Sequence, residues 1–396
     1  MKIGVVVDNE FTNDIRVTNE CDILSNNGHD IKVLCLNFGS YPKTVRLNNK
    51  VFVYRILISR KLKNILFALT NFIDIYSIWW SFKIKRFIIK HNIDIIHVHD
   101  LYMAKAAFIA TKNTKIKLVL DLHENYPYAV NGYAWMHKRF SKYIIRPWKW
   151  KDKEGIFLSF PDGIVVLSDS FKSELLNRYQ FLREEQFVVY PNVPNIQKLL
   201  EYKIDKEILN SKNDFVLFYF GAINKRRGID LLFDSIYELS KQISNLKLLL
   251  IGPVDKAEKQ WFERRIGESI INKYTTHYAW KDISLLPSYI MASNICLSPI
   301  EKNPQHESGI ANKVFQYMLF EKPVIVSNCL PQESLIHKYN CGLSFQWNSV
   351  ESFIDSVIKI YSNPTDANEM GKNGRDAVNK HFNNTVLTSD LLSLYK

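Results

Sequence analysis

The chain has 396 residues, of which 46% are hydrophobic and 23% charged, a composition typical of a soluble globular protein. This length exceeds what one ordinary core supports, so two domains of similar size are expected. The net charge of +12 indicates an anionic partner, and nucleic acid, an anionic membrane and a phosphate-bearing substrate all fit it.

The N-terminus and the apolar runs predict a cytoplasmic protein without a spanning helix. The opening MKIGVVVD is too short for a signal peptide, and no uninterrupted apolar run of about 18 residues occurs. The nearest candidate, 64–84, is interrupted by Asn71 and Asp74 and is expected to form a buried or interfacial helix. The five cysteines form no CxxC pair, which predicts reduced thiols in the core.

Short apolar, β-branched runs recur through the first half of the chain. They lie at 2–8, 30–36, 51–57, 94–100, 117–123, 163–168 and 187–192. Runs that are apolar on both faces are typical of parallel strands covered by helices. The segment 16–29 between two of them has helical apolar spacing, with Gly28 as the expected C-cap. This alternation predicts a doubly wound sheet.

The same alternation restarts after a connection around 191–213. Strands are expected at 214–222, 246–253, 295–300, 322–327 and 342–347, with an amphipathic helix at 228–243 and a helical segment at 350–396. Two successive sets of strands and helices predict two Rossmann-like, doubly wound parallel-sheet domains facing a central cleft.

Polar residues gather where two strands of the first domain end. The run at 94–98 leads into His97, His99 and Asp100, and the run at 117–122 leads into His123 and Glu124. Ligands of open α/β sheets bind at the carboxyl ends of the strands, so these residues are candidates for a site. His123 is favoured because it directly ends an apolar run. Hydrogen-bonded structural histidines are the alternative.

The loop 221–230 joins the first strand of the second domain to its helix. Lys225, Arg226 and Arg227 stand beside the helix N-terminus, where side-chain charge and free amides both favour phosphate. The alternative is a solvated basic turn.

The stretch HESGIANKVFQYM, from residue 306, predicts a second helix start with an unusual set of polar groups. Ser308 or Gly309 is expected to cap the helix, with Glu307 near its first amides. Lys313 and Gln316 are three residues apart and share one face. The stretch therefore predicts a pocket for phosphate or sugar.

A basic and aromatic segment spans 133–153. It interleaves Lys and Arg with Trp135, Tyr143, Trp148 and Trp150, which suits the headgroup zone of an anionic membrane. Nucleic-acid binding by stacking, or a solvated face with packed aromatics, are the alternatives.

Several common motifs are absent. The sequence has no GxGxxG motif, which argues against a dinucleotide-dependent dehydrogenase, and no GxSxG motif, which argues against a serine hydrolase. It also has no DxD motif, which argues against a metal-dependent nucleotide-sugar site.

Nine pieces of the chain together resemble the GT4-type glycosyltransferases, which have the two-domain GT-B fold. In order they lie at 14–34, 94–100, 121–124, 163–175, 188–195, 220–232, 248–253, 312–327 and 370–378. The resemblance implies a hexosyltransferase that moves a sugar from a nucleotide-sugar to a hydroxyl with retention, without metal or cofactor. It implies an acceptor domain over 1–195, a donor domain over 196–378 and a final helix, 379–396, that crosses back to the first domain.

The resemblance also assigns roles to residues of this sequence. It implies catalytic roles for His123, Glu307 and Arg227. It implies donor contacts from Lys225, Arg226, Arg227, Gly252, Ser308, Gly309, Asn312, Lys313 and Gln316. On the acceptor side it implies Asp14, Arg16, His99, Asp100 and Glu124.

Two features depart from the family pattern. Members often carry two glutamates eight positions apart, and here Ser308 and Gln316 stand at those positions, with Glu307 adjacent. The glycine-rich N-terminal loop is replaced by DNEFTNDIRV.

The expected process is the assembly of a bacterial surface polysaccharide or glycolipid, such as capsule or lipopolysaccharide. Its expected partners are a nucleotide-sugar, a glycan or lipid-linked glycan, and the inner face of the cell membrane through 133–153, but not nucleic acid. A UDP-sugar 2-epimerase of the same fold and a non-catalytic nucleic-acid or membrane binding protein are the alternatives.

Overall fold

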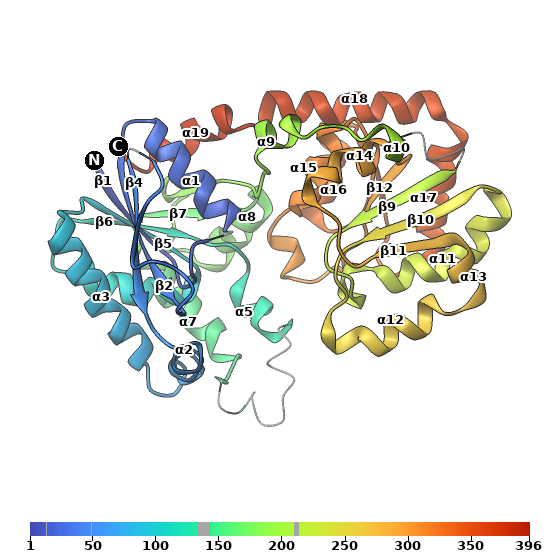
Figure 1. The fold of residues 1–396 in the computed structure, drawn as a ribbon. Coiled ribbons are helices and arrows are strands. Elements are labelled where there is room, and N and C mark those ends of the chain that lie inside the picture. Colours follow the sequence, from blue (N-terminus) through green and yellow to red (C-terminus); the bar gives the residue numbers. More distant parts are fainter. Residues whose placement is uncertain (13, 49, 133–142, 144, 210–213) are drawn as a thin grey trace. The chain divides into compact units, whose positions relative to one another are not determined.

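The computed structural model describes residues 1–396 except 13, 49, 133–142, 144 and 210–213 (Figure 1). The described residues form two compact units. Unit 1 consists of Met1–Pro191 together with Leu387–Lys396, and unit 2 consists of Asn192–Val386.

Unit 1 is built on an eight-stranded sheet with the order β3-β4-β2-β1-β5-β6-β7-β8. Its strands are β1 (Lys2–Val6), β2 (Asp30–Asn37), β3 (Thr44–Arg46), β4 (Val51–Leu57), β5 (Ile95–His99), β6 (Lys117–Asp121), β7 (Gly163–Val166) and β8 (Phe187–Val189). All neighbouring strands pair in parallel except β3, which is antiparallel to β4.

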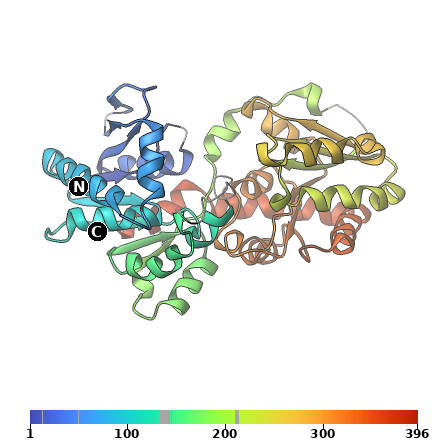
Figure 2. The ribbon, with the colours of Figure 1, turned by 90° about the horizontal axis from the view of Figure 1, so that it is seen from below.

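Helices cover both faces of this sheet (Figure 1 and Figure 2). They are α1 (Ile15–Asn26), α2 (Arg60–Ala68), α3 (Ile75–His91), α4 (Ala104–Thr111), α5 (Tyr126–Ala129), α7 (Lys149–Leu158) and α8 (Asp169–Arg178), and the last residues of α19 (Asn384–Ser393) join them. One face carries the large apolar core, in which Ile96, Val98 and Leu120 pack with residues of α3, α4 and α7. Side chains alternate along a strand, so His97, His99 and Asp121 point to the opposite face.

Unit 2 contains a six-stranded parallel sheet with the order β11-β10-β9-β12-β13-β14. Its strands are β9 (Phe215–Phe220), β10 (Leu246–Ile251), β11 (Thr275–Tyr278), β12 (Ile295–Ser298), β13 (Val324–Ser327) and β14 (Gly342–Phe345). Its helices are α9 (Ile196–Glu201), α10 (Lys206–Leu209), α11 (Ile229–Gln242), α12 (Lys259–Ile266), α13 (Ser269–Tyr274), α14 (Leu286–Met291), α15 (Asn312–Leu319), α16 (Leu330–Tyr339), α17 (Val350–Ser362) and α18 (Pro364–His381).

The two predicted parallel-sheet domains are therefore confirmed, and every expected strand is present. Two strands were missed: β3 is short and mostly exposed, and β11 reads Thr-Thr-His-Tyr without an apolar run. The prediction of one helix over 64–84 is wrong. The chain forms α2 and α3 instead, because Asp74 caps the start of α3 by accepting a hydrogen bond from the backbone N–H of Ser77.

The five cysteines are free and buried, as predicted. Among the described residues, no helix combines the length and the apolar character needed to cross a bilayer.

Candidate active site

The first cluster of polar residues lies at the carboxyl ends of β5 and β6 in unit 1. Arg16, which α1 contributes, donates from Nε and Nη2 to the two carboxylate oxygens of Asp121, both at 2.9 Å. Its Nη1 donates to the backbone oxygen of Tyr190 at 2.8 Å, and its Nε lies 3.1 Å from Glu20 Oε1. Arg16, Glu20 and Asp121 are all buried. This geometry holds one guanidinium between two carboxyl groups.

The charges in this cluster are set by burial and by these contacts. Burial favours a proton on Asp121, but Arg16 and His123 outweigh it and hold the pKa of Asp121 well below its usual range. Burial and the nearby Asp121 carboxylate raise the pKa of Glu20 well above its usual range. Burial lowers the pKa of His97 and of His99. Asp121 is therefore the ionised partner of Arg16, while burial favours the neutral forms of Glu20, His97 and His99.

His123 is the solvent-accessible member of this cluster. Its Nε2 lies 2.9 Å from His99 Nδ1 and 3.3 Å from Asp121 Oδ2, and its Nδ1 lies 3.9 Å from Asp100 Oδ1. Burial lowers its pKa, but the Asp121 and Asp100 carboxylates outweigh burial and raise the pKa of His123 to about 9. The side chain is 23% exposed, against 1% for His99. The arrangement presents a cationic imidazole at the surface of a buried polar network.

The remaining predicted residues of unit 1, Asp14, Asp100 and Glu124, have different surroundings. Asp14 caps α1, accepting a hydrogen bond from the backbone N–H of Val17 at 3.2 Å. Asp100 has a φ of 72°, a strained conformation for a residue with a side chain, and accepts a hydrogen bond from the Tyr102 hydroxyl. Glu124 is partly buried beside His123 in sequence. His99, Asp100 and His123 are therefore brought together as predicted from their strand ends.

Three residues of this cluster were not predicted as site residues. Asp121 and Glu20 belong to the charge network described above, and Asp8 lies buried beyond β1, where it accepts a hydrogen bond from Tyr76 and pairs with Lys63 at 2.9 Å. Burial raises the pKa of Asp8. A carboxylate that ends an apolar run, as Asp8 does, or interrupts one, as Asp121 does, is the sequence signal that could have identified them.

Four side chains of the cluster could approach a metal ion. Ligand atoms of Glu20, His97, His99 and Asp121 lie within 4.8 Å of one another, and all four residues are buried. However, the Arg16 guanidinium already neutralises Asp121 and occupies both of its oxygens. A cation would have to compete with this guanidinium, so the residues are better suited to a charge-balanced polar network.

The second cluster lies at the carboxyl ends of β9 and β12 in unit 2, around the loop that contains Gly221 and Gly228. The Asn224 side chain accepts a hydrogen bond from the backbone N–H of Arg227 at 3.0 Å and so closes a 3-10 turn over Lys225–Arg227. Gly228 has a φ of 79°, and a Cβ there would lie 1.8 Å from the Pro299 backbone oxygen. Gly252 has a φ of 151°, and a Cβ there would lie 2.0 Å from the Gly221 oxygen. Glycine at 228 and 252 therefore allows the segments that follow β9, β10 and β12 to approach one another closely.

Lys313 places its ammonium group against this loop. The Nζ atom is buried without a hydrogen-bond partner among the described residues and lies 3.7 Å from the centre of the Tyr219 ring. It would lie 3.4 Å from a Cβ at Gly221, so it sits directly against the loop backbone. Burial, and after it the Arg227 charge, hold the pKa of Lys313 well below its usual range. A buried cation without an anionic partner is destabilising, and an anionic ligand would correct this.

The three basic residues of the loop differ in their surroundings. Arg227 is partly buried, and burial lowers its pKa. Arg226 Nη1 lies 3.5 Å from Gln305 Oε1. Lys225 is exposed, and its Nζ lies 5.4 Å from the centre of the Trp261 ring. The Arg227 charge contributes to the lowered pKa of Lys313, so these two basic side chains lie close to each other.

The predicted helix start at 306–309 is wrong. His306–Ser308 form a single 3-10 turn, Gly309 is extended with a φ of −171°, and α15 begins at Asn312 after an Ala311 cap. Ser308 Oγ donates to the backbone oxygen of Gln305 at 2.6 Å and therefore does not cap a helix. The first free amides of α15 thus lie three residues later than expected.

The other predicted donor residues surround α15. Glu307 Oε2 accepts a hydrogen bond from the backbone N–H of Leu330, at the start of α16. Asn312 Nδ2 donates to the backbone oxygen of Asn192 at 3.1 Å, and Gln316 is buried on α15. His306, which was not predicted as a site residue, is buried, and its Nε2 has no hydrogen-bond partner among the residues that the structure describes. Burial lowers its pKa to about 4.

The basic and aromatic segment predicted at 133–153 lies partly outside the described residues, which exclude 133–142 and 144. Within the described part, Trp148 is 52% exposed, but Trp150 is 1% exposed and packs against Tyr126 in the core of unit 1. The expectation that Trp150 contributes to a surface for membranes is therefore wrong.

The chain is similar to known proteins over most of its length. Residues 201–377 match the family model "Glycosyl transferases group 1", and residues 15–197 match "Glycosyltransferase Family 4". The capsular polysaccharide biosynthesis glycosyltransferase CapM of Staphylococcus aureus is 22% identical over 299 residues, which cover 73% of this chain and 72% of the relative.

Solved structures with a similar fold include two that match along the whole chain. Sucrose-phosphate synthase from Thermosynechococcus elongatus has a TM-score of 0.76 and 18% identity and covers 100% of this chain and 98% of its own. Anabaena HepE in complex with UDP has a TM-score of 0.71 and 14% identity, covering 100% and 99%. Together with the family matches, these neighbours show two α/β domains of the GT-B type.

Proposed function

Because this chain belongs to the GT4-type glycosyltransferases of the GT-B fold, we propose that it transfers a hexose with retention from a nucleotide-sugar to a hydroxyl. Surface polysaccharide or glycolipid assembly is the proposed process, and the printed name of the relative CapM supports it. We place the donor on unit 2 and the acceptor on unit 1, as the family resemblance implies.

The observation that carries this proposal is the buried Nζ of Lys313, which has no hydrogen-bond partner in the described part of the chain and lies beside Arg227 and the Gly221–Gly228 loop. Two cations held against the ends of β9 and β12 would stabilise the negative charge that develops on a departing nucleoside diphosphate. Fixed donors of this kind contribute about 3 kcal/mol each to the transition state in other enzymes. Lys225 and Arg226 would assist from the more exposed side of the same turn.

The remaining roles are assigned by the same reasoning. Gln316 can donate to and accept from ribose hydroxyls, and Gly252, Ser308, Gly309 and Asn312 belong to the same donor region. His123 is the proposed contact of unit 1 with the reacting sugar, because it is the accessible, cationic end of its network. Glu307 already holds the start of α16, so its proposed catalytic role requires that it also reach the sugar.

On the acceptor side, we propose that Glu124 and Asp100 approach the acceptor. The buried His99 would act from behind through His123, and Asp14 and Arg16 would hold α1 and Asp121 in place. The transfer is proposed to need no metal ion, since basic side chains are available for the leaving diphosphate. Peripheral attachment to the cytoplasmic face of the membrane through 133–153 remains a prediction.

A thermal-shift screen of UDP-, GDP-, dTDP- and ADP-sugars tests this function. A true donor at 100 times its wild-type Kd should stabilise the fold by about 2.7 kcal/mol, and Lys313→Met should lower this stabilisation to about 1.4 kcal/mol or less. Lys372→Met, at an exposed position of unit 2, is the control.

Product analysis then distinguishes the alternatives. Slow release of free sugar with the anomeric configuration of the donor, measured by NMR with EDTA present, supports a metal-independent retaining transferase. Conversion of a UDP-sugar to its 2-epimer would support the epimerase instead. The absence of a shift with every nucleotide-sugar, combined with tight binding to DNA, would contradict both.

A further inference from the structure

The helix α3 of unit 1 carries an exposed apolar stripe. Ile75, Ile78, Phe82 and Ile89 are 46%, 49%, 69% and 68% exposed. At 100° per residue, these four positions fall within an arc of about 60° on one face of the helix. The opposite face, with Trp80 and Ile84, is fully buried in the core. The helix therefore has two apolar faces, and the core covers only one of them.

The exposed apolar surface extends beyond α3 along the chain. Leu62 and Ile65 of α2 are 47% and 48% exposed, and Phe72 and Ile73, between the two helices, are 62% and 56% exposed. Single exposed apolar residues are ordinary, but such a run over two neighbouring helices marks an interaction surface.

Basic side chains border the stripe on both sides. By the same helical geometry, Lys83, Arg86 and Lys90 follow one edge of the stripe, and Lys85 follows the other. Among the described residues, no carboxylate pairs with any of these four side chains, and none of the ion pairs of unit 1 includes them. Unpaired Lys and Arg beside an exposed apolar stripe are typical of helices that lie in the interface of an anionic membrane.

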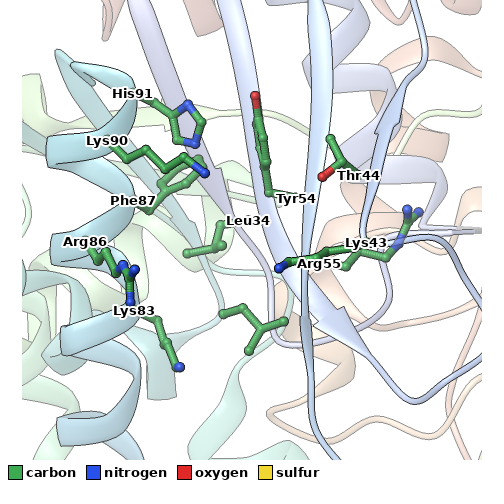
Figure 3. A pocket seen from close by; sticks show the side chains of 11 residues that line it. Leu34, Lys43, Thr44, Tyr54, Arg55, Lys83, Arg86, Phe87, Lys90 and His91 are labelled. Carbon is green, nitrogen blue, oxygen red and sulfur yellow. The ribbon is translucent and has the colours of Figure 1, made fainter.

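A pocket of about 400 Å³ opens beside this basic edge (Figure 3). One wall consists of Lys83, Arg86 and Lys90 on α3, and Lys43 and Tyr54 contribute to the wall formed by the strands. In Figure 3, Lys90 extends from α3 toward Tyr54 across the pocket. The described residues that line the pocket include no Asp or Glu, and the basic side chains outnumber any acidic group near them. A phosphate group would meet several cations there at once.

We propose that the α3 face is a docking surface for an anionic lipid bilayer, with the stripe in the acyl boundary and the basic pocket holding a headgroup phosphate. Both features are needed for this choice: a soluble phosphate would not require the apolar stripe, and a nucleic acid would not require exposed Ile and Phe on α2 and α3. The inference deepens the proposed function. It rests on that function only in one respect, because a lipid-linked acceptor of the transferase would lie in the same membrane.

Vesicle flotation of the full chain tests this proposal. Wild type should bind phosphatidylcholine vesicles containing phosphatidylglycerol at least tenfold more tightly than phosphatidylcholine alone, and raising the salt should weaken binding. The triple variant Lys83→Gln, Arg86→Gln, Lys90→Gln should lose at least tenfold in affinity for the anionic vesicles. Its control removes the same charge from exposed sites of unit 2 by Lys256→Gln, Lys359→Gln and Lys372→Gln.

The apolar stripe is tested separately. Phe82→Ser with Ile89→Ser should weaken vesicle binding at least tenfold, whereas Trp280→Ser with Ile283→Ser, exposed residues of unit 2, should not. Because all four positions are exposed, these variants are expected to fold, and circular dichroism verifies this.

Three outcomes would overturn the proposal. The first is an equal loss of vesicle binding in a variant and its control, and the second is equal binding to neutral and anionic vesicles. The third is a preference for a labelled DNA duplex or for inorganic phosphate over vesicles. Thermal shifts with nucleotide-sugars, measured on the same variants without vesicles, report the proposed function independently. A normal shift with absent vesicle binding rejects only the docking surface, and vesicle binding without any shift rejects only the transferase.

Discussion

Lys313 lies in a place that disfavours its positive charge. Its Nζ is buried without a hydrogen-bond partner among the described residues, and burial together with the Arg227 charge lowers its pKa. A diphosphate bound beside it would raise that pKa again, so nucleotide binding should be accompanied by proton uptake at alkaline pH. Titration calorimetry with UDP near pH 8.5 or so, in buffers of different ionisation enthalpy, measures this uptake.

The matching control for this prediction is Lys322→Met, since Lys322 is also partly buried with a lowered pKa. Lys313→Met should abolish the proton uptake and weaken UDP binding at least tenfold, roughly 1.4 kcal/mol, while Lys322→Met should do neither. Identical proton uptake in wild type and Lys313→Met would refute the assignment.

His123 should couple the stability of unit 1 to pH. Its folded pKa of about 9 lies above the ordinary 6.5, so the protonated form stabilises the fold. This stabilisation is complete below pH 6.5 and is lost as the pH rises through 9. The shift corresponds to at most about 3 kcal/mol.

Urea denaturation of wild type and His123→Asn at pH 6 and pH 10 measures this contribution. The difference in unfolding free energy between the two proteins should be larger at pH 6. His381→Asn, at an exposed histidine of unit 2, controls for the loss of an ordinary imidazole. A difference that is the same at both pH values would show that His123 is not held in its charged form.

The residues of this network could be predicted only in part. The grouping of His99, Asp100 and His123 followed from the rule that strand ends share one edge of the sheet. The pairing of Arg16 with Asp121 joins residues 105 positions apart, and no local sequence pattern indicates it. The unpartnered state of Lys313 likewise depends on where the Gly221 backbone passes, which sequence spacing does not encode.

At the scale of the elements, Gly228 determines how the β9–α11 connection meets β12. A Cβ there would lie 1.8 Å from the Pro299 oxygen, and the φ of 79° disfavours any other residue. Gly228→Ala should therefore destabilise unit 2 by more than about 2 kcal/mol, combining backbone strain with a clash. Hydrogen exchange resolved by peptide measures the effect on each unit separately.

Gly28 provides the matched control for this substitution. It also has a positive φ, of 91°, but a Cβ there would meet nothing within 4 Å. Gly28→Ala should lower the free energy of unfolding of unit 1 only by the backbone strain, about 1 kcal/mol. Equal destabilisation by the two substitutions would mean that the contact with Pro299 relaxes freely.

Elements were predicted well where apolar runs marked them and poorly where local hydrogen bonds decided. The parallel strands are continuous apolar runs, so the sequence identified them. The start of α15 was misplaced because Ser308 bonds within its own turn and Gly309 is extended, although both residue types are favoured at helix N-caps. The break between α2 and α3 depends on the Asp74 cap, which competes with an otherwise helical pattern.

At the scale of the whole molecule, the repeated alternation of strands and helices was sufficient to predict two domains. The contribution of Leu387–Lys396 to unit 1 depends on long-range packing. Leu391 is fully buried, the Tyr395 hydroxyl lies 2.6 Å from His97 Nδ1, and a Cβ at Gly163 would meet Leu394 at 2.8 Å. From the sequence, only the family resemblance suggested such a return.

Leu391→Ala tests how much this segment contributes. Removing a fully buried leucine side chain should destabilise unit 1 by about 3 kcal/mol and leave unit 2 unchanged. Scanning calorimetry should show one transition lowered and the other unmoved. Ser393→Ala, at an exposed position of the same helix, should shift neither transition, and lowering of both transitions by Leu391→Ala would contradict the separation of the units.

The return of the last residues to unit 1 has a consequence for biosynthesis. A ribosome delivers Met1–Pro191 first, but the segment that holds Leu391 and Tyr395 emerges only after all of unit 2 has been translated. Until then, His97 lacks the tyrosine hydroxyl that faces it, and Gly163 lacks the Leu394 side chain that packs beside it. Synthesis of unit 1 thus begins first, but its fold is completed last. A nascent chain stalled within unit 2 would expose the incomplete core of unit 1 to chaperones and proteases.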